Sequence, residues 1–124
     1  MALPVNRPHS EINISGHMAD LSTASSAYIV ATHRGRLKRC FTVIANAITT
    51  ADATVTIKIR GTTTGKTITV ATSSSAAGDV DSVDLGYMGT SNFVNEGDLI
   101  EFATDGACDT TCITRCVAVI DRVN

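Results

Sequence analysis

Residues 53–70 read ATVTIKIRGTTTGKTITV, and this stretch decides the fold. In its first half, Val55, Ile57 and Ile59 alternate with polar side chains, which is the two-residue period of a strand with one buried face. The second half repeats the alternation with two further apolar residues. Two such runs around a glycine-containing segment predict a β-hairpin, with Val55, Ile57 and Ile59 facing the core.

The middle of this stretch, GTTTGKT, is similar to a phosphate-binding loop. Such a loop needs four residues between its first glycine and the Gly-Lys-Thr triplet, and a helix must begin where it ends. Here only three residues separate Gly61 from Gly65, and the segment that follows alternates like a strand. We therefore interpret GTTTGKT as a hairpin turn, in which Gly61 and Gly65 adopt positive φ angles.

The same alternation recurs along the rest of the chain. Clusters of turn-forming residues separate the apolar runs at short, fairly regular distances, and no convincing amphipathic helix is present. This pattern predicts an all-β protein with a single antiparallel β-sandwich, of the jelly-roll kind. The expected strands lie within residues 27–33, 36–47, 53–60, 66–74, 78–86, 96–106 and 110–123.

The first 27 residues have a different character. Both prolines lie here, and the apolar residues are scattered among small and polar ones. We predict an extended N-terminal arm over residues 1–27, followed by the sandwich domain over residues 28–124. Such an arm is either flexible or ordered by lying on another surface.

Composition and charge restrict the protein class. The chain has 124 residues, of which 44% are hydrophobic, as expected for one globular domain. Residues 1–66 carry eight Lys or Arg and three acidic residues (net +5), whereas residues 67–124 carry two and nine (net −7). This polarity favours docking on a charged partner, and an unevenly charged soluble surface is the alternative. No signal peptide or spanning segment of ~20 apolar residues is present, so we expect cytoplasmic synthesis and no membrane partner.

The four cysteines raise the question of a metal site, because Cys108, Cys112 and Cys116 are spaced C-x3-C-x3-C. Residues four apart on a strand are ~13 Å apart, too far to share one zinc ion. A tight turn around Cys108 and Cys112 could still bring two ligands together. We interpret these residues, with Cys40, as buried free thiols that act as small hydrophobic side chains, and predict neither metal nor cofactor.

Catalytic patterns are weak in this sequence. The chain contains neither a Gly-x-Ser-x-Gly elbow nor a His-Glu-x-x-His motif. Asp79, Asp81 and Asp84 lack the spacing and terminal glutamate of an EF-hand. The histidines lie in or near the predicted arm, at positions His9, His17 and His33. We predict that the protein is not an enzyme.

The strongest charge cluster is HRGRLKR, over residues 33–39. Strand alternation would place Arg34, Arg36 and Lys38 on one face, opposite Leu37 and Arg39. Nucleic-acid binding is disfavoured, because the cluster has no interleaved aromatic residues and the chain as a whole is acidic. A protein-docking surface and a solvated strand edge both remain open.

Several phrases together resemble a known family. They are ISGHMADLSTASSAYIVATHRGRLKR (residues 14–39), NAITTADATVTIKI (46–59), SAAGDVDSVDLG (75–86) and NEGDLIEFATDGA (95–107). From about Ile12 to the end, the chain resembles the head decoration, or capsid cement, proteins of tailed bacteriophages. The C-terminal cysteine cluster departs from that family's pattern.

The resemblance implies a non-enzymatic virion protein on the outer surface of the expanded phage head. It would stabilise the head by bridging neighbouring major capsid protein subunits, and would itself form a homotrimer or a dimer. The candidate capsid-binding residues are the apolar side chains of the arm and the basic cluster, namely Leu3, Val5, Ile12, Ile14, Met18, Leu21, Arg34, Arg36, Lys38 and Arg39.

The alternative is a host-attachment or glycan-binding β-sandwich module of a head fibre or tail. Such modules present aromatic residues on which a sugar ring can stack. Most of the five aromatic residues fall within apolar strands, and Tyr87 is the one plausible aromatic residue in a loop.

Overall fold

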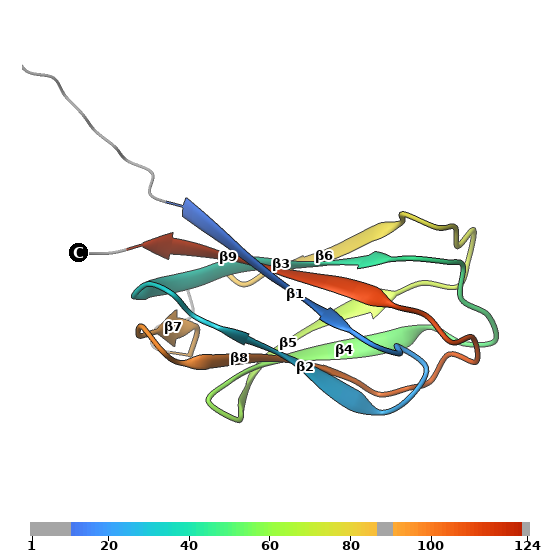
Figure 1. Ribbon diagram of the computed structural model, residues 1–124, viewed down its shortest axis with the longest axis horizontal. Coiled ribbons are helices and arrows are strands. Elements are labelled where there is room, and N and C mark those ends of the chain that lie inside the picture. The colour runs from blue at the N-terminus through green and yellow to red at the C-terminus, as the bar shows by residue number, and fades with distance from the viewer. Residues whose placement is uncertain (1–10, 87–90, 123–124) are drawn as a thin grey trace, which may run out of the picture.

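The computed structural model describes residues 11–86 and 91–122. Within these residues the chain forms nine strands, which Figure 1 shows as two layers packed face to face. The described residues include no helix that is long and apolar enough to cross a bilayer. The strands are β1 (Glu11–Met18), β2 (Ser25–Val30), β3 (Gly35–Ile44), β4 (Ala53–Ile59), β5 (Thr62–Val70), β6 (Val80–Asp84), β7 (Phe93–Val94), β8 (Leu99–Thr104) and β9 (Thr114–Arg122).

The strands divide between two antiparallel sheets, and the chain passes repeatedly from one sheet to the other. Sheet A has the order β1-β9-β3-β6, with the short β7 also paired to β3. Sheet B has the order β2-β8-β4-β5. The prediction of an antiparallel β-sandwich of jelly-roll type is confirmed.

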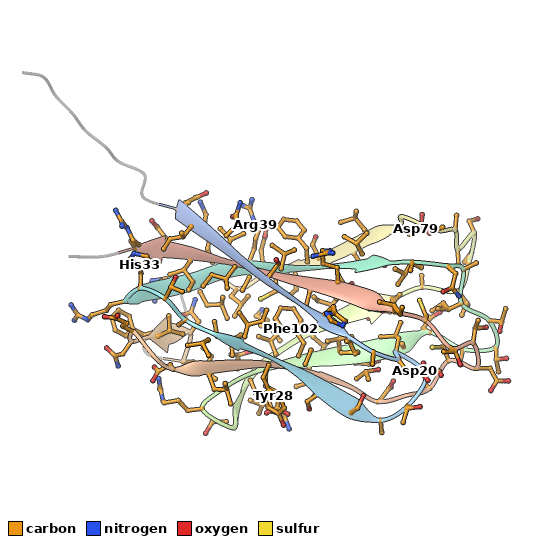
Figure 2. The ribbon with its side chains drawn as sticks, in the orientation of Figure 1. Asp20, Tyr28, His33, Arg39, Asp79 and Phe102 are labelled. Atoms are coloured by element: carbon orange, nitrogen blue, oxygen red, sulfur yellow. The ribbon has the colours of Figure 1, made fainter. Side chains whose placement is uncertain are left out.

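The core lies between the inner faces of the two sheets. Val55 and Ile57 are fully buried and Ile59 is 3% exposed, as the alternation predicted. Phe102 of β8 is fully buried and lies between the layers in Figure 2, whereas Tyr28 and Arg39 lie on opposite outer sides. Because aromatic residues are few, aliphatic side chains and cysteines fill most of this space.

The hairpin of β4 and β5 has a tighter turn than the sequence suggested. Ile59 pairs with Thr62, so the turn consists of Arg60 and Gly61, with φ angles of 54° and 81°. Two consecutive positive φ angles match the twist of the flanking strands. Gly65 also has a positive φ, 82°, but it lies inside β5, where the register with β4 shifts. The positive φ angles are confirmed, and the residues 61–65 form a turn plus a bulge rather than one turn.

The predicted arm over residues 1–27 is wrong for its second part, and the boundary at residue 28 falls inside β2. Glu11–Met18 is a strand of sheet A that pairs along its whole length with β9. Its residues Ile12, Ile14, Gly16 and Met18 alternate with polar ones, so it buries one face like any other strand. Residues 1–10 lie outside the described residues.

Candidate functional site

The apolar residues predicted to dock on a capsid lie in different environments. Met18 and Leu21 are 2% and 0% exposed and belong to the core. The backbone N–H of Leu21 donates to the carbonyl of Cys112, and its own carbonyl accepts from Thr104 Oγ1. These two residues therefore cannot contact a partner, because folding has already buried them.

Of the remaining apolar residues of that set, the structure describes Ile12 and Ile14. Ile12 and Ile14 are half-buried on the inner face of β1. Leu3 and Val5 lie outside the described residues. The apolar docking arm predicted from the sequence is thus not a feature of residues 11–27.

The basic cluster lies on the outer side of sheet A and in the loop before β3, but not with the predicted alternation. The β3–β9 register shifts between Leu37 and Arg39. This bulge makes Lys38 an extra residue, so that Arg39 lies on the outer face with Lys38, rather than inside with Leu37. Sequence alternation alone could not reveal the bulge.

Each cation of this cluster has a partner within the chain. Lys38 forms an ion pair with Glu11, and Arg39 Nε lies 3.1 Å from Asp84 Oδ1. The Arg36 guanidinium donates to Asn92 Oδ1 over 3.2 Å. The Arg34 guanidinium lies 5.2 Å from the centre of the Phe93 ring, a cation–π contact.

The outer face of sheet A, which we call face A, also carries apolar residues. Phe41 and Val117 are directly opposite each other in β3 and β9 and are half-buried. Val80 and Ile113, at the same end of the sheet, are 58% and 56% exposed. Apolar side chains on the solvent side of a sheet do not contribute to the core, so they mark a surface suited to contacts with another molecule.

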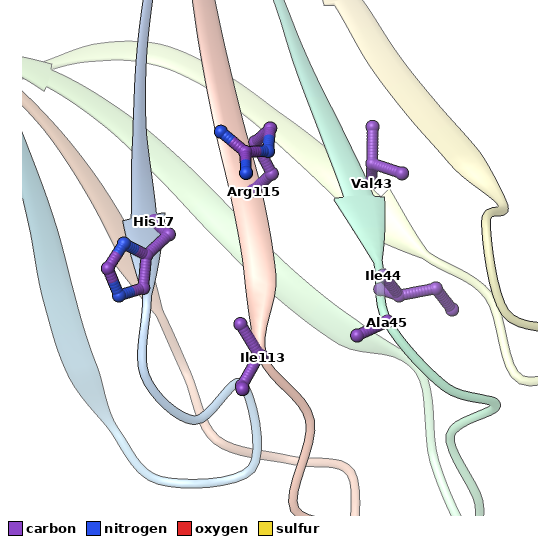
Figure 3. Close-up of a pocket in the computed structure, with 6 residues that line it drawn as sticks. All are labelled: His17, Val43, Ile44, Ala45, Ile113 and Arg115. Carbon is purple, nitrogen blue, oxygen red and sulfur yellow. The ribbon is translucent and has the colours of Figure 1, made fainter.

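An open pocket of about 390 Å³ lies at one end of face A. Figure 3 shows six residues that line it: the apolar Val43, Ile44, Ala45 and Ile113, with His17 and Arg115 on the neighbouring strands β1 and β9. His17 and Arg115 are direct partners in the β1–β9 register. Neither side chain makes a hydrogen bond or ion pair with the described residues, so both can meet an acceptor from another molecule.

The outer face of sheet B, which we call face B, presents the most exposed aromatic residue of the described chain. Tyr28 is 58% exposed, and the next residue on the same side of β2, Val30, is 52% exposed. Glu101 lies opposite Tyr28 in β8 and Lys58 lies opposite Glu101 in β4. Ser26 Oγ donates to Glu101 Oε2 over 2.5 Å, which holds that carboxylate beside the ring.

Tyr87, the predicted sugar-stacking residue, lies outside the described residues, so its exposure cannot be compared with that of Tyr28. Tyr28 was missed for a specific reason. It stands in the run AYIVATH, which was interpreted as a short apolar strand, although period-two alternation from the buried Ala27 and Ile29 would have placed its ring outside.

The cysteines are buried free thiols, as predicted. Burial raises the pKa of Cys116 to about 12, and burial together with the neighbouring Cys116 raises that of Cys40. Such thiols stay protonated and unreactive at neutral pH. Among residues 11–86 and 91–122, no three His, Cys, Asp or Glu side chains are grouped so that they could hold a metal ion.

Comparison with known proteins supports the fold. No family model and no curated protein matches the sequence. Among solved structures, the chain is similar to Xyl-CBM35 in complex with a glucuronic acid containing disaccharide, with 16% identity and a TM-score of 0.52, over 85% of this chain and 76% of that one. It also aligns with a CBM35 from Cellvibrio japonicus Abf62, with 15% identity and a TM-score of 0.49, over 92% and 99% of the two chains. At 16% identity, the likeness to Xyl-CBM35 shows a shared β-sandwich fold.

Proposed function

We propose that this chain is a non-enzymatic module that binds a carbohydrate on face B. The observation that carries the proposal is a row across three strands, in which the exposed ring of Tyr28 is followed by Glu101 and then by Lys58, two charged side chains with opposite hydrogen-bonding roles. The Glu101 carboxylate accepts hydrogen bonds and the Lys58 ammonium donates them. A sugar hydroxyl group both donates and accepts hydrogen bonds. The row of Tyr28, Glu101 and Lys58 therefore suits a ligand that carries several hydroxyl groups.

The chemistry of the row fits a sugar ring in a second way. One face of a pyranose ring consists largely of C–H groups, which pack against the flat π-surface of an aromatic side chain. Tyr28 offers that surface on an edge strand, where a long polymer can lie across it without steric hindrance from further strands. Ser26, hydrogen-bonded to Glu101, keeps the polar group at a fixed position relative to the ring.

The fold likeness supports the proposal without deciding it. Xyl-CBM35 is by its name a carbohydrate-binding module, and its structure contains a disaccharide. One sandwich fold serves many functions, so the exposed residues of this chain, rather than its fold, support carbohydrate binding.

A glycan array tests this proposal. We expect the wild-type chain to bind at least one glycan, and Tyr28→Ala to weaken that binding at least tenfold. Val30→Ala is the matched control, because Val30 is similarly exposed on the same side of the same strand. Binding of no glycan, or equal binding by the Tyr28→Ala variant, would exclude face B as a sugar site.

Capsid decoration is the second candidate function, and face A favours it. Apolar side chains across β3, β6 and β9, flanked by the Lys38–Glu11 and Arg39–Asp84 ion pairs, resemble the apolar centre and polar rim of a protein interface. In this function the protein sits on the outside of a phage head, contacts the major capsid protein, and acts as a homo-oligomer. Hundreds of modest contacts would together stabilise the head.

Binding to expanded heads that lack the protein tests the second candidate. Saturation at hundreds of copies per head is the expected result, and the double variant Val80→Ser, Ile113→Ser should bind much more weakly. Val30→Ser with Leu99→Ser, which changes exposed residues of face B, is the control. A dozen copies or none would remove capsid decoration and leave the carbohydrate function in place.

A further inference from the structure

The edges formed by β5, β6 and β1 differ in how well they are protected against pairing with another strand. At the β5 edge a bulge around Gly65 breaks the regular register, and Lys66 lies beside it. The β6 edge is five residues long and contains Asp81 and Asp84. Short length, bulges and charges are the usual ways of blocking an edge. Sheet A ends on its other side at β1, which has eight residues in unbroken register with β9.

The β1 strand also buries its apolar side chains only in part. Ile12 and Ile14 are half-buried, whereas their partners in β9, Ile120 and Ala118, are fully buried. The outward edge of β1 has no hydrogen-bonded strand among the described residues. A further strand along this edge would cover both isoleucines and use the free backbone groups.

The sequence of β1, EINISGHM, is complementary to itself when run antiparallel. With a two-fold axis at Ile14, the residue numbers of each facing pair sum to 28. Glu11 of one copy then faces His17 of the other, Asn13 faces Ser15, and Ile14 faces its own equivalent. Facing residues of an antiparallel pair lie on the same side of the sheet, so outward residues meet outward ones, and Ile12 meets Gly16 on the inner side.

The charges favour this register further. His17 lies directly beside Arg115 on the outer face, and neither has an acidic partner among the described residues. The Glu11 carboxylate of the second copy would approach both side chains. That carboxylate also forms an ion pair with Lys38 of its own chain, on the side away from the new contact. The symmetry provides this contact twice.

We propose that two copies of this chain pair through their β1 strands, antiparallel and centred on Ile14, so that two A sheets become one continuous sheet. The occupant of the edge is a second copy because the alternation of β1 lets it pair with itself, and the register centred on Ile14 places the Glu11 carboxylate opposite His17. The pairing leaves face B free, so the inference does not depend on either proposed function.

Sedimentation equilibrium of the full chain gives the first test. We expect a species of twice the 13.0 kDa monomer mass that dissociates on dilution. His17→Glu should weaken this dimer about tenfold, because two pairs of like charges then face each other. Adding Glu11→Lys to that variant should restore the affinity. A chain that stays monomeric at all concentrations overturns the proposal.

Cysteine cross-linking tests the register. Facing Cα atoms of an antiparallel pair are about 4.5–5.5 Å apart, within the range of a disulfide. Ile14→Cys should therefore form a dimer-linking disulfide under mild oxidation. Ile12→Cys is the matched control, because two such residues would be four positions apart, ~13 Å. A folded dimer in which Ile14→Cys does not cross-link, or in which Ile12→Cys does so instead, excludes this interface; circular dichroism verifies folding of both variants.

Discussion

The outer faces of the two sheets follow the same two-residue alternation but expose different side chains. Face A has Phe41 and Val117 at its centre, with Val80 and Ile113 largely exposed. Most of the face B side of β4 and β5 consists of threonine and lysine, and its exposed apolar residues are confined to the β2–β8 side, at Tyr28, Val30 and Leu99.

The difference between faces A and B shows which side chains of a sandwich are informative about function. The inner faces must be apolar for the sheets to pack, so their composition reports only the fold. The outer faces are under no such constraint. An apolar residue that the fold leaves uncovered therefore points to contact with another molecule, and a polar row with one aromatic ring points to a different kind of ligand.

The largest expected loss of stability comes from a change that forces apart β3 and β9, the central strands of face A. A Cβ atom on Gly35 would lie 2.3 Å from the carbonyl oxygen of Asp121, within the β3–β9 pairing. Because backbone cannot move aside cheaply, Gly35→Ala should lower the free energy of unfolding by about 3 kcal/mol in urea denaturation. Gly78→Ala is the control; its φ of 87° imposes strain, but no atom lies within 4 Å. An equal loss in both variants would contradict the close approach.

The two aromatic residues allow a direct comparison of the faces. Phe41 is half-buried against Val117, so Phe41→Ala should lower the free energy of unfolding by about 1–2 kcal/mol. Tyr28 is 58% exposed, so Tyr28→Ala should change it by about 0.5 kcal/mol or less. Urea denaturation of the two variants measures this difference. Equal losses would mean that face B packs as tightly as face A.

Asp20 lies in the turn between β1 and β2, which joins the two sheets, and gives a pH-dependent effect. Hydrogen bonds from the Ser22 side chain and backbone hold the pKa of its carboxyl group below the ordinary 3.8. A lowered pKa in the folded state means that the charged form stabilises the protein above pH 3.8, and that this contribution is lost as the pH falls through the folded-state pKa.

The variant Asp20→Asn should therefore be less stable than the wild type at neutral pH, with a difference that shrinks as the pH falls below 3.8. Urea midpoints measured at several pH values give the comparison. A constant difference across that range would show that the Asp20 carboxylate contributes nothing through its charge.

The smallest effect is expected at the rim of face A. Arg39 and Asp84 are exposed over 39% and 75% of their side chains, so water and salt screen the pair. Arg39→Gln should lower the free energy of unfolding by about 0.5 kcal/mol or less. A double-mutant cycle with Asp84→Asn isolates the interaction. A coupling that persists in high salt would mean that the pair is shielded from solvent.

Much of the fold was predictable because its signals are local. The alternation of Val55, Ile57 and Ile59 identified a strand and its buried face. One sequence signal was present but was outweighed by another. The alternation of Ile12, Ile14 and Gly16 indicates a strand, yet the prolines nearby suggested an arm.

The candidate site was much less predictable. Met18 and Leu21 were expected on the surface, and only the packing of the β1–β2 turn against Cys112 and Thr104 shows that they are internal. Partner strands far away in the sequence decide which side of a strand is covered. An alternating pattern alone does not reveal which partner covers it.

By itself, the sequence determined that the chain alternates with a period of two, that a glycine-containing segment starting at Gly61 reverses it, and that GTTTGKT is not followed by a helix. These properties depend on side-chain and backbone preferences within a few residues. Only the tertiary structure decided that residues 11–18 close one edge of sheet A, that a bulge at Lys38 turns Arg39 outward, and that Tyr28 stands on an open face. Those outcomes depend on strand pairing between distant residues, because register and burial are set by what each strand packs against.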